Sequence, residues 1–445
     1  MTDSIPNLGL IFFPAYDWAI SRGHPEREER LLYTHDQLRE EGVFDFAEIQ
    51  EFRATAAEPR DVQRVHFLPL GLETVASLPH LISAGGAIAA GLLVATGKTR
   101  KSFALVRPPG HHAGKVVHGG RGFCNVNNEA IMLEKLRRER GYRRIAIVDT
   151  DCHHGDGSQD IFWHDPDVLF ISLHQDGRTL YPGSGAATEL GGPRAWGATV
   201  NIPLPPGTGD EGFSLAVKEI VRPILDEWKP ELVINSAGQD NHFTDPITNM
   251  SLSALGYAEM SALIRPDIAV LEGGYAIQGA LPYTNLAIIM SMAGLDYAKV
   301  QEPLPPGGAP RDRPATLEYI RETAAFIHRA RRGPPDPQYT EMALKDGFWT
   351  RRREIFYDSH PADPQKQPNW PSHIRETRLE RLRDCPHCRG ILVIESASTV
   401  APRQTFVQLP PDPCSQCLAL SRDLAPDGLL PAPGDAVADA PAGKG

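Results

Sequence analysis

Short apolar runs alternate with longer helical patterns over the first 300 residues of the chain. The short runs are rich in β-branched residues and are bounded by Gly, Pro, Asn and Asp, which is typical of strands. We predict strands at Leu8–Phe13, Phe103–Val106, Ile145–Val148, Val168–Ser172, Ala198–Ile202, Leu232–Asn235 and Ile268–Leu271. We predict helices between them at Gly86–Ala95, Asn128–Glu139 and Phe213–Asp226. This alternation predicts an α/β fold, in which a parallel sheet is flanked by helices on both faces.

One long segment, Leu81–Gly97, is continuously apolar and rich in Gly and Ala. It is shorter than a membrane span requires, and small residues favour close packing against neighbouring elements. We therefore expect a buried helix here and no association with a membrane.

The pattern changes after about residue 303, where proline becomes frequent. Thr316–Arg331 has apolar residues on one face and is predicted to be an amphipathic helix. Trp349–Arg383 is charged and aromatic without a clear period. From Ala425 onward the chain is mostly Ala, Pro, Gly and Asp, a composition that cannot bury a core, so we expect disorder.

Four of the predicted strands run directly into clusters of polar residues. These clusters are Arg107-Pro108-Pro109-Gly110-His111-His112, Asp149-Thr150-Asp151-Cys152-His153-His154-Gly155-Asp156-Gly157, Ser236-Ala237-Gly238-Gln239-Asp240 and Glu272-Gly273-Gly274-Tyr275. Ligand sites of open α/β sheets form beyond the carboxyl ends of the strands. We therefore expect the four clusters to form one site.

The cluster after Val148 has the composition of a metal site. Side chains alternate along a strand, so Asp149, Asp151 and His153 leave its end pointing the same way. The alternative is a solvated acidic loop, which does not account for two adjacent His beside a buried strand. Asp151, His153 and Asp240 together give three ligands, the number that holds a catalytic zinc and leaves one position for water.

The remaining polar residues suit the hydrolysis of an amide at such a metal. Bound zinc lowers the pKa of water and polarises a carbonyl oxygen. His111 and His112 offer a general base and a general acid, and Asp149 and Asp156 would each orient one imidazole. The hydroxyl of Tyr275 would donate to a developing oxyanion.

These clusters resemble the motifs of the histone deacetylase family, especially its class II-like bacterial branch of acetyl-lysine and acetylpolyamine amidohydrolases. The resemblance spans about residues 8–300 and keeps the order and spacing of the family. Besides the clusters above, it includes Gly23-His24-Pro25-Glu26-Arg27, Gly122-Phe123-Cys124-Asn125, Ser172-Leu173-His174 and Tyr181-Pro182-Gly183-Ser184-Gly185. It implies an arginase/deacetylase fold and the same three zinc ligands.

The resemblance also implies roles for residues around the metal. His112 would act as general base and acid with Asp156 behind it, while His111 would pair with Asp149. Tyr275 would hydrogen-bond the acyl carbonyl and the oxyanion.

Further roles follow from the same resemblance. Phe123 and Tyr181 would wall the acyl-lysine channel, with Tyr181 standing where many relatives carry Phe. Gly122 would meet the substrate amide through its backbone. A structural K⁺ would be held near the following residues, mainly by backbone carbonyls: Asp149, Asp151, His153, Ser172 and Leu173.

Three departures from the family pattern bear on the substrate and the metal. The loop after Arg64-Val65-His66 offers only Glu73 where relatives that grip a peptide carry an acidic rim residue. Asp245-Pro246 is followed by Ile247 rather than by the Glu of polyamine-selective relatives. The segment around Asp240 lacks the second carboxylate that binuclear manganese chemistry of the arginase type requires.

A second metal site is predicted near the C-terminus from two Cys-x-x-Cys pairs. Cys385, Cys388, Cys414 and Cys417 flank two β-like segments and would complete a tetrahedral structural zinc site, a zinc ribbon. The alternative is two unrelated thiol pairs. Cys124 and Cys152 are expected to be packing residues, because no ligand is missing.

The expected domains are a deacetylase catalytic domain, a Pro-rich linker with a helical extension, the zinc ribbon and a disordered tail. Their ranges are residues 1–303, 304–383, 384–424 and 425–445.

Composition narrows the class of partner and the compartment. The 445-residue chain has a formal net charge of -11 and no long basic block, which argues against nucleic acid as its main partner. Six cysteines, four of them in pairs, fit a reducing compartment. Because Met1–Pro6 has no basic region and Leu8–Phe13 is too short for a signal peptide, a cytoplasmic enzyme is expected.

The sequence therefore predicts a zinc-dependent amide hydrolase that removes acetyl or related acyl groups from lysine side chains or acylated amines. Two alternatives stay open. One is an acetylpolyamine amidohydrolase, and the other is a deacetylase-like binding or regulatory module that acts through its zinc ribbon. The sequence leaves a homo-oligomer open as well.

Overall fold

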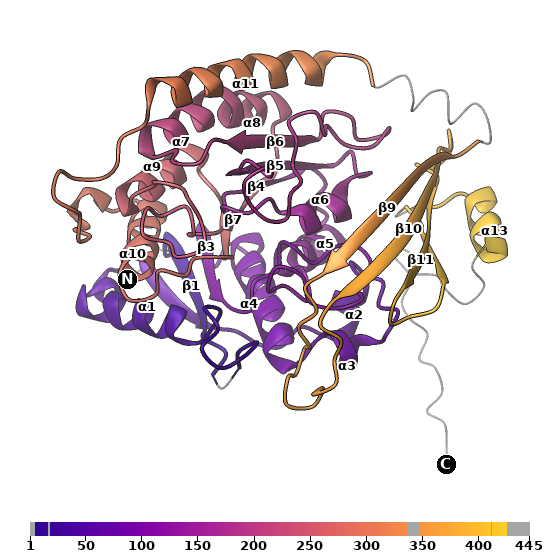
Figure 1. Ribbon diagram of the computed structural model, residues 1–445, viewed down its shortest axis with the longest axis horizontal. Helices are drawn as coiled ribbons and strands as arrows, with labels where there is room; N and C mark the ends of the chain where they lie inside the picture. The colour runs from indigo at the N-terminus through magenta and orange to yellow at the C-terminus, as the bar shows by residue number, and fades with distance from the viewer. Residues whose placement is uncertain (1–4, 17, 336–346, 411, 425–445) are drawn as a thin grey trace.

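The computed structural model describes residues 5–16, 18–335, 347–410 and 412–424, which form two β-sheets (Figure 1). The larger sheet has eight strands in the order β2-β1-β3-β8-β7-β4-β5-β6, and every neighbouring pair is parallel. Its strands are β1 (Leu8–Phe13), β2 (Ile49–Arg53), β3 (Lys101–Val106), β4 (Ile145–Asp149), β5 (Val168–Gln175), β6 (Thr199–Leu204), β7 (Leu232–Ala237) and β8 (Ile268–Leu271). The predicted parallel α/β fold is confirmed, and β2 is the strand of this sheet that the pattern missed.

Both faces of the large sheet are buried, which explains why its strands read as continuous apolar runs. Successive residues of a strand point to opposite faces. In β4, Ala146 and Val148 belong to one buried cluster, whereas Ile145 and Ile147 belong to the other.

Helices cover each face of the sheet. The first cluster includes residues of α1 (Glu29–Glu40), α7 (Asp210–Ala216), the π-helical turn η2 (Val217–Val221), α8 (Arg222–Trp228), α9 (Ala254–Ile264), α10 (Ala280–Ala293) and α11 (Pro314–Arg332). The second includes residues of α2 (Pro59–Gln63), α4 (Leu78–Ala95), α5 (Asn128–Arg140) and α6 (Asp156–Phe162). Short helices complete the fold at η1 (Val43–Asp45), α3 (Leu72–Val75) and η3 (Tyr297–Lys299).

Two helices correspond to the apolar helix and the amphipathic helix that the sequence predicted. Helix α4 has the length and composition to cross a bilayer, yet 56% of that window is buried within the protein, where it packs on α5, β1 and β3. The amphipathic helix predicted after the proline-rich segment is α11, which buries Ile320, Ala324 and Ile327 (Figure 1).

The second sheet is antiparallel, with the strand order β12-β11-β10-β9. It consists of β9 (Trp349–Tyr357), β10 (Ile374–Arg383), β11 (Ile391–Ser398) and β12 (Gln404–Gln408), and α13 (Ser415–Leu424) follows it. Residues 349–383, expected to belong to a linker and helical extension, thus form two strands, and β10 pairs with β11 across the expected boundary at residue 383. The tail predicted from Ala425 lies outside the described residues.

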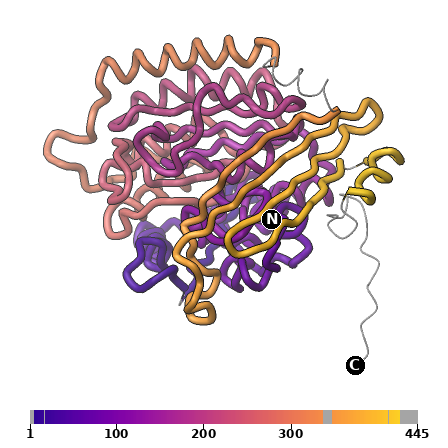
Figure 2. Tube along the Cα trace, turned by 45° about the vertical axis from the view of Figure 1, so that its right-hand side comes forward, coloured from indigo at the N-terminus to yellow at the C-terminus, as the bar shows by residue number. Residues whose placement is uncertain are grey.

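The small sheet lies against the large domain, and in Figure 2 its strands run obliquely across the front of the molecule. Phe67 of the large domain stacks on Phe406 of β12 at a centroid distance of 4.6 Å. Beside this contact, the buried Arg378 guanidinium donates to Asp160 Oδ2 at 2.8 Å and to Glu376 Oε1 at 2.7 Å. Apolar stacking and buried ion pairs therefore fix the small sheet on the large domain.

Candidate active site

The four strands that end in polar clusters are neighbours in the centre of the large sheet. They are β3, β8, β7 and β4, in that order. Since all four are parallel, their carboxyl ends lie at one edge, and the clusters that follow them come together as the sequence predicted.

Asp151, His153 and Asp240 converge on one point at this edge. The Nδ1 atom of His153 lies 3.1 Å from Asp151 Oδ1 and 2.8 Å from Asp240 Oδ2. One ligand atom from each of the three residues lies within 4.8 Å of the others. The second oxygens are fixed by the backbone, because Gly273 N–H donates to Asp151 Oδ2 at 2.7 Å and Cys152 N–H donates to Asp240 Oδ1 at 2.8 Å.

The charge of this triad fits a divalent cation. Both carboxylates are fully buried, and burial together with the neighbouring Asp151 raises the pKa of Asp240. Two buried carboxylates at one point repel each other unless a cation lies between them. Two carboxylates, whose second oxygens are already held by backbone N–H groups, and one imidazole nitrogen form a donor set suited to zinc.

Each of the two adjacent imidazoles is held by its own carboxylate. His111 Nδ1 lies 3.0 Å from Asp149 Oδ2, and His112 Nδ1 lies 2.8 Å from Asp156 Oδ1. Their ring centroids are 4.1 Å apart. The four residues form two neighbouring His–Asp pairs, as the sequence predicted.

The two imidazoles differ in protonation. Burial, assisted by the positive charge of His111, lowers the pKa of His112 to about 3, so this ring is neutral at neutral pH. Its Nδ1–H points at Asp156, which leaves Nε2 as an acceptor. For His111, burial lowers the pKa, but the carboxylates of Asp151 and Asp149 outweigh burial and raise it overall. A neutral His with a free Nε2 is the protonation state that a general base requires.

Arg121 is a functional residue that the sequence reasoning missed. Its guanidinium pairs with Asp156 Oδ2, the oxygen that His112 does not use. Burial raises the pKa of Asp156, but Arg121 and His112 outweigh burial, so the carboxylate stays ionised. No spacing in the sequence links two residues 35 positions apart.

Glu272 is a second residue to which the sequence gave no role. It is buried, and its Oε2 accepts hydrogen bonds from the backbone N–H groups of Gly110 at 2.7 Å and His111 at 3.0 Å. Glu272 therefore fixes the turn that carries the two imidazoles. Its position in the Glu-Gly-Gly-Tyr cluster was the available signal.

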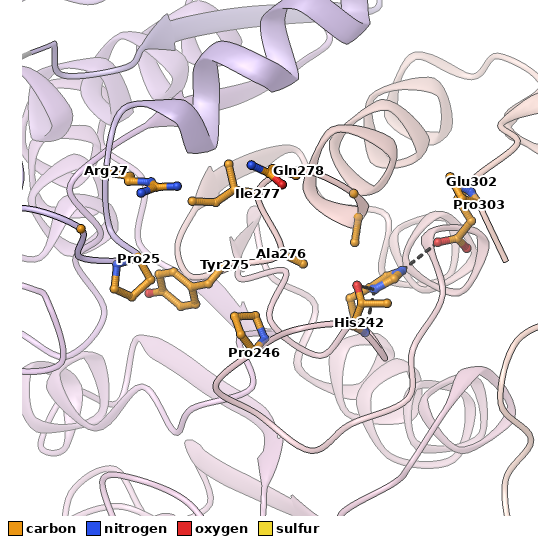
Figure 3. A pocket seen from close by; sticks show the side chains of 14 residues that line it. Pro25, Arg27, His242, Pro246, Tyr275, Ala276, Ile277, Gln278, Glu302 and Pro303 are labelled. Atoms are coloured by element: carbon orange, nitrogen blue, oxygen red, sulfur yellow. Dashed lines mark hydrogen bonds and ion pairs between the residues drawn. The ribbon is translucent and has the colours of Figure 1, made fainter. Parts of the chain in front are cut away.

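Tyr275 lies at the same edge of the sheet and lines a cavity of about 680 Å³. In Figure 3 its ring lies beside Pro25 on the cavity wall. Its hydroxyl forms no hydrogen bond with the residues that the structure describes. Burial raises the pKa of Tyr275 well above its usual range, so the phenol keeps its proton and can donate it.

The three predicted substrate-binding residues lie close to His112 and Tyr275. Tyr181 packs edge-on against His112, with ring centroids 5.3 Å apart, and Phe123 packs edge-on against Tyr275 at 5.6 Å. Gly122 has a φ of +50°, and a Cβ at this position would lie 2.2 Å from Cδ2 of His112. Only glycine allows the turn to approach the imidazole this closely.

The residues expected around K⁺ lie at the ends of two adjacent strands. Asp149 of β4 and Ser172 of β5 are paired in register, and Leu173 follows Ser172. Asp151 and His153 come directly after β4.

The six cysteines fall into two groups. Cys124 and Cys152 are buried, and burial raises both thiol pKa values well above the usual range, which fits packing residues. The other four cysteines are Cys385, Cys388, Cys414 and Cys417. Their Sγ atoms all lie within 4.8 Å of one another, beside the turn that joins β10 to β11. The Sγ atoms of Cys385 and Cys414 are 3.7 Å apart, and the four residues form no disulfide.

A parallel α/β sheet with an Asp-His-Asp triad that could hold a metal ion, a neutral carboxylate-held His and a nearby phenol forms a candidate hydrolase site. Comparison with known proteins identifies the family. Residues 72–289 match the model of the histone deacetylase domain. A protein of Archaeoglobus fulgidus named "Probable deacetylase" is 47% identical over 323 residues, which cover 66% of this chain and 89% of that protein.

A further relative and a solved structure support the same family. A "Histone deacetylase-like amidohydrolase" of Pseudomonas aeruginosa is 37% identical over 232 residues, or 50% of this chain and 60% of that protein. The structure titled "Crystal Structure of HDA15 HD domain" superposes with a TM-score of 0.62 at 26% identity, covering 77% of this chain and 97% of that one. The chain belongs to the histone deacetylase family and is an enzyme that hydrolyses amides.

Proposed function

We propose that this protein is a zinc-dependent deacylase that removes acetyl or related acyl groups from lysine side chains. The observation that carries the proposal is the placement of the neutral His112 beside the buried triad of Asp151, His153 and Asp240. Zinc held by this triad would polarise the acyl carbonyl and lower the pKa of a water molecule.

The residues around the triad have separate roles in this proposal. His112 takes a proton from the attacking water through Nε2 and returns it to the departing amine. Asp156 keeps the ring in that tautomer by accepting from Nδ1–H, and Arg121 keeps Asp156 ionised. His111 is held beside His112 by Asp149.

Tyr275 supplies a donor to the developing oxyanion in this mechanism. Its hydroxyl keeps its proton at neutral pH and is not engaged by the described residues. Such donors act at the oxygen where charge develops, and removal of one costs about a hundred- to a thousandfold in rate.

Two observations favour acyl-lysine over acylated polyamines as the substrate. Ile247 stands where polyamine-selective relatives carry Glu, and the nearby Asp245 already accepts hydrogen bonds from the backbone N–H groups of Tyr275 and Ile247. A binding module without activity would have no use for the full set of ligands, base and phenol.

The other assignments are part of the same proposal. Zinc at the four cysteines would stabilise the small sheet, K⁺ would sit beside β4 and β5, and the enzyme would work in the cytoplasm without nucleic acid or membrane as partner. Residues 1–303 would be the catalytic domain, to which the C-terminal segments are added. The proposed catalytic residues and the three proposed ligands of the catalytic zinc all lie in that range.

Acetate release from an N-acetyl-lysine peptide tests the proposal. Asp240→Ala should abolish release and Tyr275→Phe should lower it about a hundred- to a thousandfold, while both variants stay folded, as judged by their thermal midpoints. Equal release by the two variants and the wild type would rule the mechanism out. Faster turnover of N8-acetylspermidine than of every peptide would reverse the ranking of substrates.

A further inference from the structure

One carboxylate at the mouth of the site comes from the C-terminal sheet rather than from the catalytic domain. Asp358 follows strand β9, and its Oδ2 accepts hydrogen bonds from Gly122 N–H at 2.5 Å and from the Tyr181 hydroxyl at 2.9 Å. It therefore touches two of the three residues expected to bind the substrate. Asp358 lies outside residues 72–289, which match the family model.

The segment that carries Asp358 is fixed on both sides. Before it, the Tyr357 hydroxyl donates to Val116 O at 3.0 Å, and Arg121 donates to Phe356 O at 2.6 Å. After it, Ser359 N–H donates to Gly120 O at 3.3 Å. These contacts hold the carboxylate at the mouth, so its position does not depend on its own hydrogen bonds alone.

Asp358 still has room for another donor. Its side chain is exposed, and its Oδ1 accepts no hydrogen bond from any residue in the described part of the chain. An ionised carboxylate can accept about four hydrogen bonds. A donor that approaches Asp358 beside Gly122 and Tyr181 therefore meets an open acceptor.

The surroundings favour a neutral N–H donor over a polycation. Asp156 is occupied by His112 and Arg121, and Asp245 is occupied by backbone N–H groups. A polyamine carries several ammonium groups that need several free carboxylates, whereas a peptide backbone offers N–H groups without charge.

We propose that Asp358 determines specificity for peptide substrates by accepting a hydrogen bond from a main-chain N–H group next to the acyl-lysine. The inference rests on the proposed function, since it concerns the same channel. It also accounts for the loop after Arg64-Val65-His66, which offers only Glu73. The carboxylate that this loop lacks at the rim is supplied by the C-terminal sheet.

The test compares three substrates on the full-length protein. The first is an acetyl-lysine peptide, and the second is the same peptide with N-methyl groups on the main-chain amides of the acetyl-lysine and the next residue. The third is N-acetylbutylamine, which has no main chain. Asp358→Ala and Asp358→Asn are compared with Glu354→Gln, which removes an exposed carboxylate of the same strand that pairs with Arg375.

The wild type should turn over the N–H peptide at least about tenfold more efficiently, in kcat/KM, than the N-methyl peptide, as expected for a hydrogen bond to a charged group. Asp358→Ala should remove that difference by slowing the N–H peptide alone. The N-methyl peptide and N-acetylbutylamine should change less than about twofold, and Glu354→Gln should behave as the wild type on all three.

Two outcomes would overturn the inference. An equal loss on all three substrates would mean that Asp358 only holds Gly122 and Tyr181 in place. A selective loss on N8-acetylspermidine would mean that it binds an ammonium group.

Peptide binding separates this inference from the proposed function. Dissociation constants measured by fluorescence anisotropy need no turnover. If no substrate releases acetate but Asp358→Ala still weakens binding of the N–H peptide alone, the proposed function fails and the inference stands. If acetate is released and binding of the two peptides changes equally, the inference fails and the proposed function stands.

Discussion

Replacement of Gly122 by alanine tests how closely the channel turn must approach the catalytic imidazole. The residue has a φ of +50°, which costs an L-residue about 1–2 kcal/mol. The new Cβ would also lie 2.2 Å from Cδ2 of His112, whereas ordinary contacts begin at 3.4 Å. The turn and the ring must therefore separate by roughly an ångström, a displacement that can cost about a hundredfold in rate.

Gly141→Ala is the matched control for this variant. Gly141 has a φ of +76°, and a Cβ there would meet nothing within 4 Å. Gly141→Ala should lose about 1–2 kcal/mol of unfolding free energy in urea, and Gly122→Ala should lose at least as much because of the added contact with His112. Only Gly122→Ala should also lose about a hundredfold in kcat/KM for acetate release. A Gly122→Ala enzyme as active as Gly141→Ala would refute the placement of His112 at the reacting centre.

Three further predictions concern the small sheet and its metal. Arg378→Met should lower the free energy of unfolding by about 3–5 kcal/mol, because it leaves the buried Glu376 without its guanidinium partner and removes one of the two that pair with Asp160, whereas the exposed Arg375→Met should lower it by less than about 1 kcal/mol in the same urea titration. Burial raises the pKa of Asp160, but the guanidinium groups around it outweigh burial and hold that pKa well below its usual range. The stability that Asp160 contributes is therefore present above about pH 4 and lost as the pH falls toward the folded-state pKa, so the thermal midpoint should drop more steeply below about pH 4 in the wild type than in Asp160→Asn. Cys385→Ser should lose one equivalent of zinc, measured by mass spectrometry of the metal, and keep acetate release in proportion to the protein that stays folded; unchanged zinc content would disprove a site at the four thiols.

The chemistry of the site was visible in the sequence because it is concentrated at strand ends. A parallel sheet brings the ends of neighbouring strands to one edge. Each cluster could therefore be assigned to this edge from the apolar run that precedes it in the sequence. Asp151, His153 and Asp240 could be grouped for this reason, although the last lies 87 positions from His153.

Strand β10 was missed because its buried face is charged. Its alternate buried residues include Glu376, Arg378 and Glu380, which lie within ion-pair distance of His118, Asp160 and His164 of the catalytic domain. The apolar–polar alternation that marks a half-buried strand is therefore absent. Asp358 escaped notice for a related reason, since nothing near it in the sequence indicates that β9 leads to the mouth of the site.

The central claim is that Asp151, His153 and Asp240 hold the metal at which His112 works. The most direct test is acetate release from an N-acetyl-lysine peptide while Zn²⁺ is added back to chelator-treated protein. The account predicts that release returns in the wild type and does not return in folded Asp240→Ala. Release by metal-free protein, or equal recovery in the variant, would contradict it.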